Sequence, residues 1–178
     1  MNNSAIHINE IKAAAAFTKQ SFVFDEIYAN NTIVRYKRER VRKHVQQYLK
    51  SNGTILELNS GTGEDAVWFA SNGYKVHATD ISQGMQEVLQ KKVKKYNVDS
   101  RVTTELCSFT QLEKLKNKGP YDYIFSNFAG LNCTGDLEKA LQSFPSLLYP
   151  GGIVTLVILP PFSLWETLLM FKGKFKTA

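Results

Sequence analysis

Short apolar runs alternate with longer amphipathic segments over most of the chain after residue 53. Such runs favour strands, whereas apolar residues that recur every three or four positions favour helices. The pattern predicts strands at residues 54–59, 75–80, 101–108, 121–128 and 152–159. It predicts helices at residues 64–73, 82–97, 110–117, 134–148 and 162–171, the fourth broken or bent by Pro145. Apolar strands separated by helices indicate a doubly wound, mostly parallel α/β sheet that is covered on both faces.

Two helical segments are predicted before the first strand. Residues 10–30 carry a mixed apolar face, and the pair Asn30–Asn31 marks a break. A basic helix then runs from residue 35 to Lys50 and ends near Gly53. We therefore expect residues 1–50 to form a helical cap and residues 51–178 to form one α/β domain.

The formal net charge of the chain is +6, and it is concentrated in the basic helix. Residues 35–50 hold seven basic side chains and one acid, whereas the charges of the remaining chain cancel. A basic face is a candidate nucleic-acid surface. However, Val34, Val41 and Val45 recur at helical spacing, which favours a solvated helix that packs inward through these valines. We expect no nucleic-acid partner.

The composition is that of an ordinary globular protein, with 178 residues of which 43% are hydrophobic and 21% are charged. No apolar run approaches the roughly 18–20 residues that span a bilayer, and the amino terminus does not resemble a signal peptide. The two cysteines, Cys107 and Cys133, lack the spacing of metal ligands. These features predict a cytoplasmic protein with no membrane partner and no metal site.

The segment after the first strand, Asn59–Gly63, has the form of a ligand-binding turn. Gly61 and Gly63 permit backbone conformations that side chains obstruct, and they let N–H groups approach a ligand. Asp80 ends the second strand, 19 residues after Gly61. A carboxylate at this place can bind the two hydroxyls of a ribose. Taken alone, these residues also fit a nicotinamide dinucleotide site.

The charges around the turn argue against a dinucleotide. Glu57 interrupts the apolar run of the first strand, and a pyrophosphate nearby would be repelled by it. Glu64 and Asp65 stand at the start of the following helix, where they suit the helix dipole but would repel a bound pyrophosphate. A ligand that carries an ammonium group would instead be attracted to Glu57.

Four segments in this order and spacing resemble the successive motifs of class I S-adenosylmethionine-dependent methyltransferases: LELNSGTGED, ATDIS, YDYIFSN and LLYPGGIVTL. The resemblance covers residues 53–160 and implies a Rossmann-like fold, S-adenosylmethionine as cofactor and S-adenosylhomocysteine as product. The family's sheet has seven strands, whereas five are predicted here. We therefore expect a fold that lacks the last two strands, with the fifth strand at a sheet edge where a homodimer could form.

The resemblance also implies roles for individual residues. It assigns Glu57 to the methionine ammonium group, Asp80 to the ribose hydroxyls and Asn127 to the neighbourhood of the sulfonium. The turn would pass beneath the methionine portion, and the adenine ring would contact the residues that follow the second and third strands. The remaining cofactor-binding residues are thus Asn59, Ser60, Gly61, Gly63, Ile81, Met85, Ser108 and Phe109. Asn59 stands where the family usually has glycine, and Ser108 stands where an aspartate is common.

The methyl acceptor is less constrained by the sequence. The segment SNFAG, residues 126–130, lacks the Asn-Pro-Pro-aromatic motif that is associated with amino-group methylation of nucleic-acid bases or glutamine. A small-molecule acceptor is therefore favoured, and no residue is assigned as a catalytic base. Two alternatives stay open, namely an NAD(P)-dependent oxidoreductase and a protein that binds S-adenosylmethionine without turnover.

Overall fold

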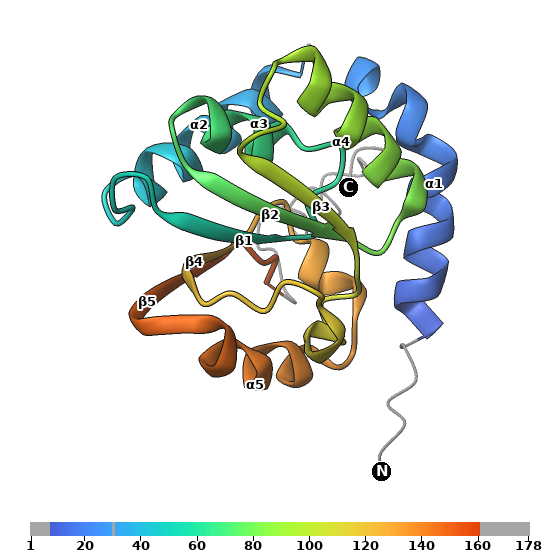
Figure 1. Cartoon of the computed structure of the whole chain (residues 1–178). Helices are drawn as coiled ribbons and strands as arrows, with labels where there is room; N and C mark the ends of the chain where they lie inside the picture. The colour runs from blue at the N-terminus through green and yellow to red at the C-terminus, as the bar shows by residue number, and fades with distance from the viewer. Residues whose placement is uncertain (1–7, 30, 161–178) are drawn as a thin grey trace, which may run out of the picture.

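The structure is a computed structural model that describes residues 8–29 and 31–160. Its centre is a five-stranded sheet in the order β3-β2-β1-β4-β5 (Figure 1). All neighbouring strands are parallel. The strands are β1 (Thr54–Leu58), β2 (Lys75–Asp80), β3 (Val102–Leu106), β4 (Tyr121–Ser126) and β5 (Leu148–Leu156). The predicted doubly wound, parallel fold is thereby confirmed, and its strand order reverses between β1 and β4.

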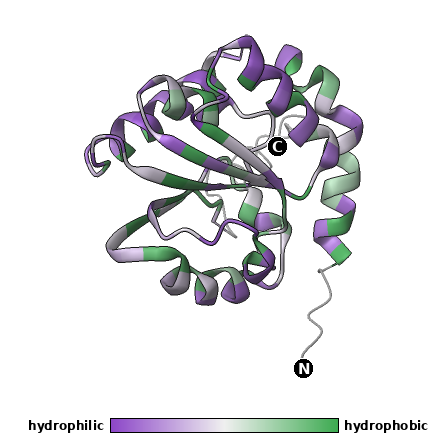
Figure 2. Cartoon of the chain, viewed as in Figure 1, coloured by the Kyte–Doolittle hydropathy of each residue, from purple (hydrophilic) through white to green (hydrophobic). Residues whose placement is uncertain are grey.

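Helices cover both faces of the sheet. The helices α3 (Glu64–Ser71) and α4 (Gln83–Lys95) pack on one face, over a core that includes Ile55 and Phe69. The helix α5 (Leu137–Leu147) packs on the other face, over a core that includes Leu56. Ile55 and Leu56 are neighbours in β1 and thus pack into the cores on opposite faces of the sheet, as expected of a strand buried on both faces. Figure 2 shows the same distribution, with apolar residues along the strands and hydrophilic residues on the outer helices.

Two helices precede the sheet, α1 (Ile8–Ala29) and α2 (Thr32–Val45). Asn31 caps α2 by accepting hydrogen bonds from the N–H groups of Ile33 and Val34. α1 lies along α4 (Figure 1). A Cβ added at Gly84 of α4 would come within 2.8 Å of the Thr18 carbonyl oxygen, so this glycine allows the two helices to approach closely.

Some predicted boundaries were wrong. The basic helix ends at Val45 and not near Lys50, because a turn at residues 46–48 follows it. A second turn, in which Asn52 has φ of 56°, then leads into β1. Only residues 112–114 of the segment 110–117 are helical, as a 3-10 turn, and the Glu105 carboxylate accepts the N–H of Lys116 beyond it. The strand β5 begins at Leu148, ahead of the predicted start, with a register shift between Tyr121 and Tyr123. Pro145 lies inside α5, which ends two residues later.

Within the described residues, β3 and β5 form the two edges of the sheet. The predicted place of the fifth strand is confirmed, whereas a homodimer through its edge stays a prediction. The predicted helix at residues 162–171 lies outside the described residues. Among the helices that the structure describes, none has the length and apolar character that a membrane crossing requires.

Candidate functional site

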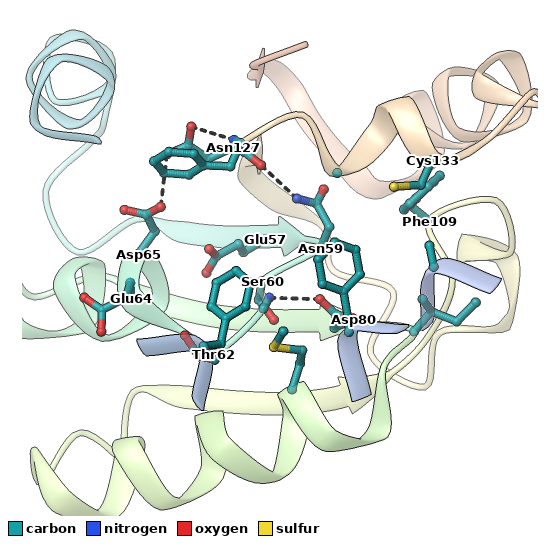
Figure 3. Close-up of a pocket in the computed structure, with 18 of the residues that line it drawn as sticks. Glu57, Asn59, Ser60, Thr62, Glu64, Asp65, Asp80, Phe109, Asn127 and Cys133 are labelled. Carbon is teal, nitrogen blue, oxygen red and sulfur yellow. Dashed lines mark hydrogen bonds between the residues drawn. The ribbon is translucent and has the colours of Figure 1, made fainter. Parts of the chain in front are cut away.

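A cavity of about 340 Å³ lies where the strand order reverses, at the carboxyl ends of β1, β2 and β4. The helices α1 and α2 contribute to its wall from the other side. Figure 3 shows the acidic and amide side chains of the loops that converge on it. Nine predicted residues line this cavity: Glu57, Asn59, Ser60, Gly61, Asp80, Ile81, Met85, Phe109 and Asn127.

The glycines of the turn have different roles. Gly61 has φ of 55°, and a Cβ built on it would meet no heavy atom within 4 Å, so its open side adjoins the cavity. Gly63 has φ of 82° and does not line the cavity. A Cβ at Gly63 would lie 2.0 Å from Cδ1 of Leu89, so this glycine lets α3 pack against α4.

Asn59, which stands where the family usually has glycine, takes a left-handed conformation that asparagine tolerates, with φ of 45°. Its side chain also connects the turn to the end of β4. The side-chain amide donates to the carbonyl oxygen of Asn127 at 2.9 Å, and the hydroxyl of Ser126 donates to Oδ1 of Asn59 at 2.6 Å. The residue therefore holds together the two loops on either side of the topological switch point.

Asp80 is held by backbone groups at the end of β2. Its carboxylate accepts the N–H of Gly61 at 2.9 Å (Figure 3) and the N–H of Ser82 at 2.8 Å. Burial raises the pKa of Asp80, and the backbone hydrogen bonds act in the opposite direction. Because two hydrogen bonds leave lone pairs on a carboxylate, Asp80 can still accept donors from a ligand in the cavity.

Glu57 is buried in the wall of the cavity, with 3% of its side chain exposed. Among the described residues, its Oε2 atom has no hydrogen-bond partner. Burial and the charge of Asp65 raise the pKa of Glu57 well above its ordinary value, against the opposing influence of Arg38 and Arg42. A buried carboxylate oxygen without a donor is costly, so a cationic ligand group placed here would be strongly favoured.

Three apolar side chains, named the apolar slot, also line the cavity. Met85 and Phe109 are buried, and Ile81 lines the cavity beside them. Such a slot suits a flat ring. Ser108 does not line the cavity, because its hydroxyl donates to Glu10 on α1. The structure thus brings together Ile81, Met85 and Phe109 of the predicted adenine contacts, but not Ser108.

Asp65 is the centre of a buried charge network that the sequence analysis missed. Its carboxylate accepts Nη1 of Arg38 at 2.5 Å and Nε of Arg42 at 2.7 Å. It also accepts the side-chain amide of Asn127 at 3.0 Å (Figure 3). The interpretation of Asp65 as a helix-dipole residue and of α2 as a solvated helix was therefore incomplete. The sequence did contain a sign of this network. Arg38 and Arg42 have the same helical spacing as the inward valines of α2, which places them on the same side of that helix.

The helix α1 supplies cavity residues that sequence reasoning also missed. Glu10, Ala13, Phe17, Phe24 and Tyr28 line the cavity, and their spacing places them on one side of the helix. Phe24 and Tyr28 have ring centroids 4.7 Å apart. The periodic spacing on this side of α1 was visible in the sequence, but the sequence did not show that this side faces the cavity.

A second cavity of about 340 Å³ lies between α1 and α2. It shares six residues with the first cavity, so the two adjoin: Phe24, Tyr28, Val34, Arg38, Thr62 and Glu64. Arg38 also lies 4.4 Å from the ring centroid of Phe128, which follows β4. Aromatic rings and a guanidinium group thus border the region where the cavities meet.

Comparison with known proteins identifies the family of this chain. A family model described as a methyltransferase domain matches residues 55–152, more than half of the chain. A demethylmenaquinone methyltransferase of Leptospira interrogans is 25% identical over 135 residues, which are 75% of this chain and 50% of that protein. An S-adenosyl-L-methionine-dependent Diels-Alderase of Talaromyces variabilis is 30% identical over 110 residues, 61% of this chain and 37% of that protein. The chain spans half or less of the length of these relatives.

Solved structures show the same fold. Phosphoethanolamine N-methyltransferase 2 of Haemonchus contortus, in complex with S-adenosyl-L-methionine, superimposes with a TM-score of 0.65 at 24% identity. That match covers 88% of this chain and 37% of the other. The DhpI–S-adenosylhomocysteine complex gives a TM-score of 0.62 at 20% identity, over 85% and 70% of the two chains. With the family model, the motifs and the cavity in agreement, this chain belongs to the family of S-adenosylmethionine-dependent methyltransferase domains.

Proposed function

We propose that the cavity binds S-adenosylmethionine and that the protein transfers its methyl group to a small-molecule acceptor. The observation that carries this proposal is the unpartnered oxygen of Glu57, in the same cavity as the backbone-held carboxylate of Asp80. The cofactor has a methionine ammonium group that suits Glu57 and ribose hydroxyls that suit Asp80. When bound, it supplies an already activated methyl group on a sulfonium.

The protein's part in this chemistry is chiefly to position the reactants and exclude water. Ile81, Met85 and Phe109 form an apolar slot for the adenine ring, and the open side of Gly61 leaves space for the ligand backbone. Asn59 and Asn127 hold the loops between which the reactive end of the cofactor would lie. No base is assigned, because an activated methyl donor needs one only when the acceptor is weakly acidic.

The acceptor would approach through the second cavity, between α1 and α2. The adjoining region is bordered by Phe24, Tyr28 and Phe128 together with the guanidinium group of Arg38. Aromatic walls with a few fixed polar groups are typical of small-molecule sites, and the second cavity adds the charged side chains of Asp25, Arg35, Glu39, Arg42 and Glu64. The names of two relatives, a demethylmenaquinone methyltransferase and a phosphoethanolamine N-methyltransferase, also favour a small acceptor, whereas the name of one solved structure of this fold refers to an rRNA-methylase. The free thiols of Cys107 and Cys133 suit a reducing compartment such as the cytoplasm.

A second candidate function is a cofactor-binding protein that performs no methyl transfer. It is favoured by the similarity to the Diels-Alderase, whose name joins S-adenosyl-L-methionine dependence to another reaction class. The nicotinamide oxidoreductase is disfavoured by Glu57, because its carboxylate in the cavity would repel a pyrophosphate.

Isothermal titration calorimetry with S-adenosylhomocysteine, NADH and NADPH tests the proposal. We expect S-adenosylhomocysteine to bind and the two nicotinamide cofactors not to bind. Asp80→Ala should weaken binding at least about tenfold, since charge-assisted hydrogen bonds are worth about 1.5–3 kcal/mol each. Asp99→Ala, at an exposed position, is the matched control and should bind normally. Unchanged affinity in Asp80→Ala would refute the assignment of the cavity.

A screen of metabolite extracts with a labelled methyl donor then separates the two candidate functions. Transfer of label to a small molecule supports the methyltransferase. Tight S-adenosylhomocysteine binding without transfer to any extract component would favour the protein that binds the cofactor without methyl transfer.

A further inference from the structure

Glu10 is a buried acid near the start of α1, with 1% of its side chain exposed. Three hydroxyl groups donate to its carboxylate. The hydroxyl of Thr134 donates to Oε1 at 2.7 Å, that of Thr110 donates to Oε2 at 2.9 Å, and that of Ser108 donates to Oε2 as well. These donors come from the segments that follow β3 and β4, so Glu10 connects α1 to two loops of the sheet.

The Glu10 side chain also forms part of the cavity wall. It lines the cavity together with the apolar slot of Ile81, Met85 and Phe109, and with Cys133. Burial raises the pKa of the Cys133 thiol, and the charges of Asp80 and Glu10 raise it further, as expected if both carboxylates lie near this thiol. A carboxylate therefore borders the slot that suits a flat ring.

We propose that Glu10 recognises the adenine ring of the cofactor by accepting a hydrogen bond from its exocyclic amino group. This inference rests on the proposed binding of S-adenosylmethionine. It assigns to the amino-terminal helix a contact that the sequence analysis had sought at Ser108, where the family commonly has an aspartate.

The hydrogen-bond capacity of the two residues supports this assignment. The Ser108 hydroxyl is already engaged, because it donates to Glu10 and accepts the N–H of Thr110 at 3.1 Å. An ionised carboxylate has about four acceptor positions. The single hydroxyl hydrogen of Thr110 is shared between Oε1 at 3.1 Å and Oε2 at 2.9 Å, so the three hydroxyl donors supply three hydrogens and leave one position for a ligand. The same three donors fix the orientation of the Glu10 carboxylate before the ligand arrives, which reduces the entropy lost on binding.

Such a contact makes the site selective for an amino group on the ring. A ring with an oxygen at this position presents an acceptor to the carboxylate, and two acceptors repel each other in a buried site. A glutamine at position 10 would lack this selectivity, because its amide can both donate and accept.

The test compares S-adenosylhomocysteine with S-inosylhomocysteine, which carries an oxygen in place of the amino group. Calorimetry would measure both ligands against the wild type, Glu10→Gln and Ser108→Ala. We expect the wild type to favour the adenine compound by about tenfold or more, as a charge-assisted hydrogen bond implies. Glu10→Gln should bring the two affinities within about threefold of each other, since a neutral amide serves either ring. Ser108→Ala should retain the wild-type preference.

Each outcome bears on the inference. If Glu10 only anchors α1, Glu10→Gln will weaken both ligands equally and leave their ratio unchanged, which overturns it. Loss of the preference in Ser108→Ala together with a retained preference in Glu10→Gln overturns it too, because Ser108 would then recognise the ring. If the wild type binds the two ligands with nearly equal affinity, the inference is overturned, even if Glu10→Gln fails to fold. Wild-type protein that does not bind S-adenosylhomocysteine refutes the proposed function and this inference together, whereas binding with an unchanged ratio in Glu10→Gln refutes the inference alone.

Discussion

The side-chain amide of Asn127 donates a hydrogen bond to the Asp65 carboxylate at 3.0 Å, which connects the end of β4 to the first turn of α3. The same carboxylate pairs with Arg38 and Arg42 of α2, and only 3% of the Asp65 side chain is exposed. One buried acid thus fixes a helix of the amino-terminal segment, the glycine turn and the loop beside the cavity.

Replacement of Asp65 by asparagine should destabilise the protein. The two arginines would lose their anionic partner while 19% and 15% of their side chains are exposed. Removing one partner of a buried ion pair lowers the free energy of unfolding by about 3 kcal/mol or more. Urea denaturation would measure this loss. Lys50→Ala is the control. The side chain of Lys50 is 66% exposed, so its ion pair with Asp122 should contribute under about 0.5 kcal/mol to the free energy of unfolding. Equal midpoints for wild type and Asp65→Asn would contradict the role of the network.

Alanine substitutions at the two glycines of the turn should have different effects. Gly61→Ala meets no neighbouring atom, so it should cost only the left-handed strain of about 1–2 kcal/mol. Its methyl group would occupy space beside the cavity, so S-adenosylhomocysteine should bind more weakly. Gly63→Ala places its Cβ 2.0 Å from a carbon of the buried Leu89, so overpacking of about 1–3 kcal/mol adds to the strain.

Thermal unfolding and calorimetry on both variants check this contrast. The expected pattern is a modest loss of stability with a clear loss of affinity for Gly61→Ala, and a larger loss of stability for Gly63→Ala. Normal S-adenosylhomocysteine binding by Gly61→Ala would mean that the ligand does not pass over Gly61.

Because of Glu57, the free energy of unfolding and the affinity for S-adenosylhomocysteine should both depend on pH, in opposite directions. Its pKa in the folded protein is raised above the ordinary value of 4.5, so the neutral carboxyl is the form that favours folding. The corresponding stability is fully present below 4.5 and is lost as the pH rises through the raised pKa. A ligand ammonium group needs the ionised form, so affinity for S-adenosylhomocysteine should rise over that same interval.

Glu57→Gln separates these two effects. At neutral pH the ligand-free variant should unfold at a higher temperature than the wild type, because position 57 then carries no charge, yet it should bind S-adenosylhomocysteine more weakly. Its affinity should also depend less on pH, with the remaining dependence due to Asp80, whose pKa is raised as well. If Glu57→Gln is less stable than the wild type and its affinity depends on pH as strongly as that of the wild type, this account of Glu57 is refuted.

The parts of the site that the sequence predicted are those whose signals are local. The five strands, the turn around Gly61 and the carboxylate of Asp80 follow from patterns within a few residues of one another. Parallel topology then brings the carboxyl ends of the strands to one edge, which is why these residues meet.

The parts that were missed depend on pairings between distant segments. The hydroxyl of Ser108 is bound by Glu10, which lies 98 residues away, and Asp65 is held by Arg38 from 27 residues away. Each of these side chains looks ordinary in its own segment, as an acid on a helix or a charge on a solvated face. Only the docking of α1 and α2 on the sheet shows which acids and arginines are buried together.

The last prediction is that α2 is not a nucleic-acid surface, despite its charge. Arg38 and Arg42 are turned inward to Asp65, which leaves Arg35, Lys37, Arg40 and Lys43 as the exposed basic residues. Helical spacing spreads these four over about half of the helix circumference, and the exposed Glu39 lies between Arg35 and Lys43 and offsets part of their charge. Fluorescence anisotropy with short RNA and DNA duplexes at physiological salt should give dissociation constants no tighter than about 1 µM, the range of non-specific binding. Submicromolar binding with a steep salt dependence, lost in a Lys37→Glu/Lys43→Glu variant, would show that this face binds nucleic acid.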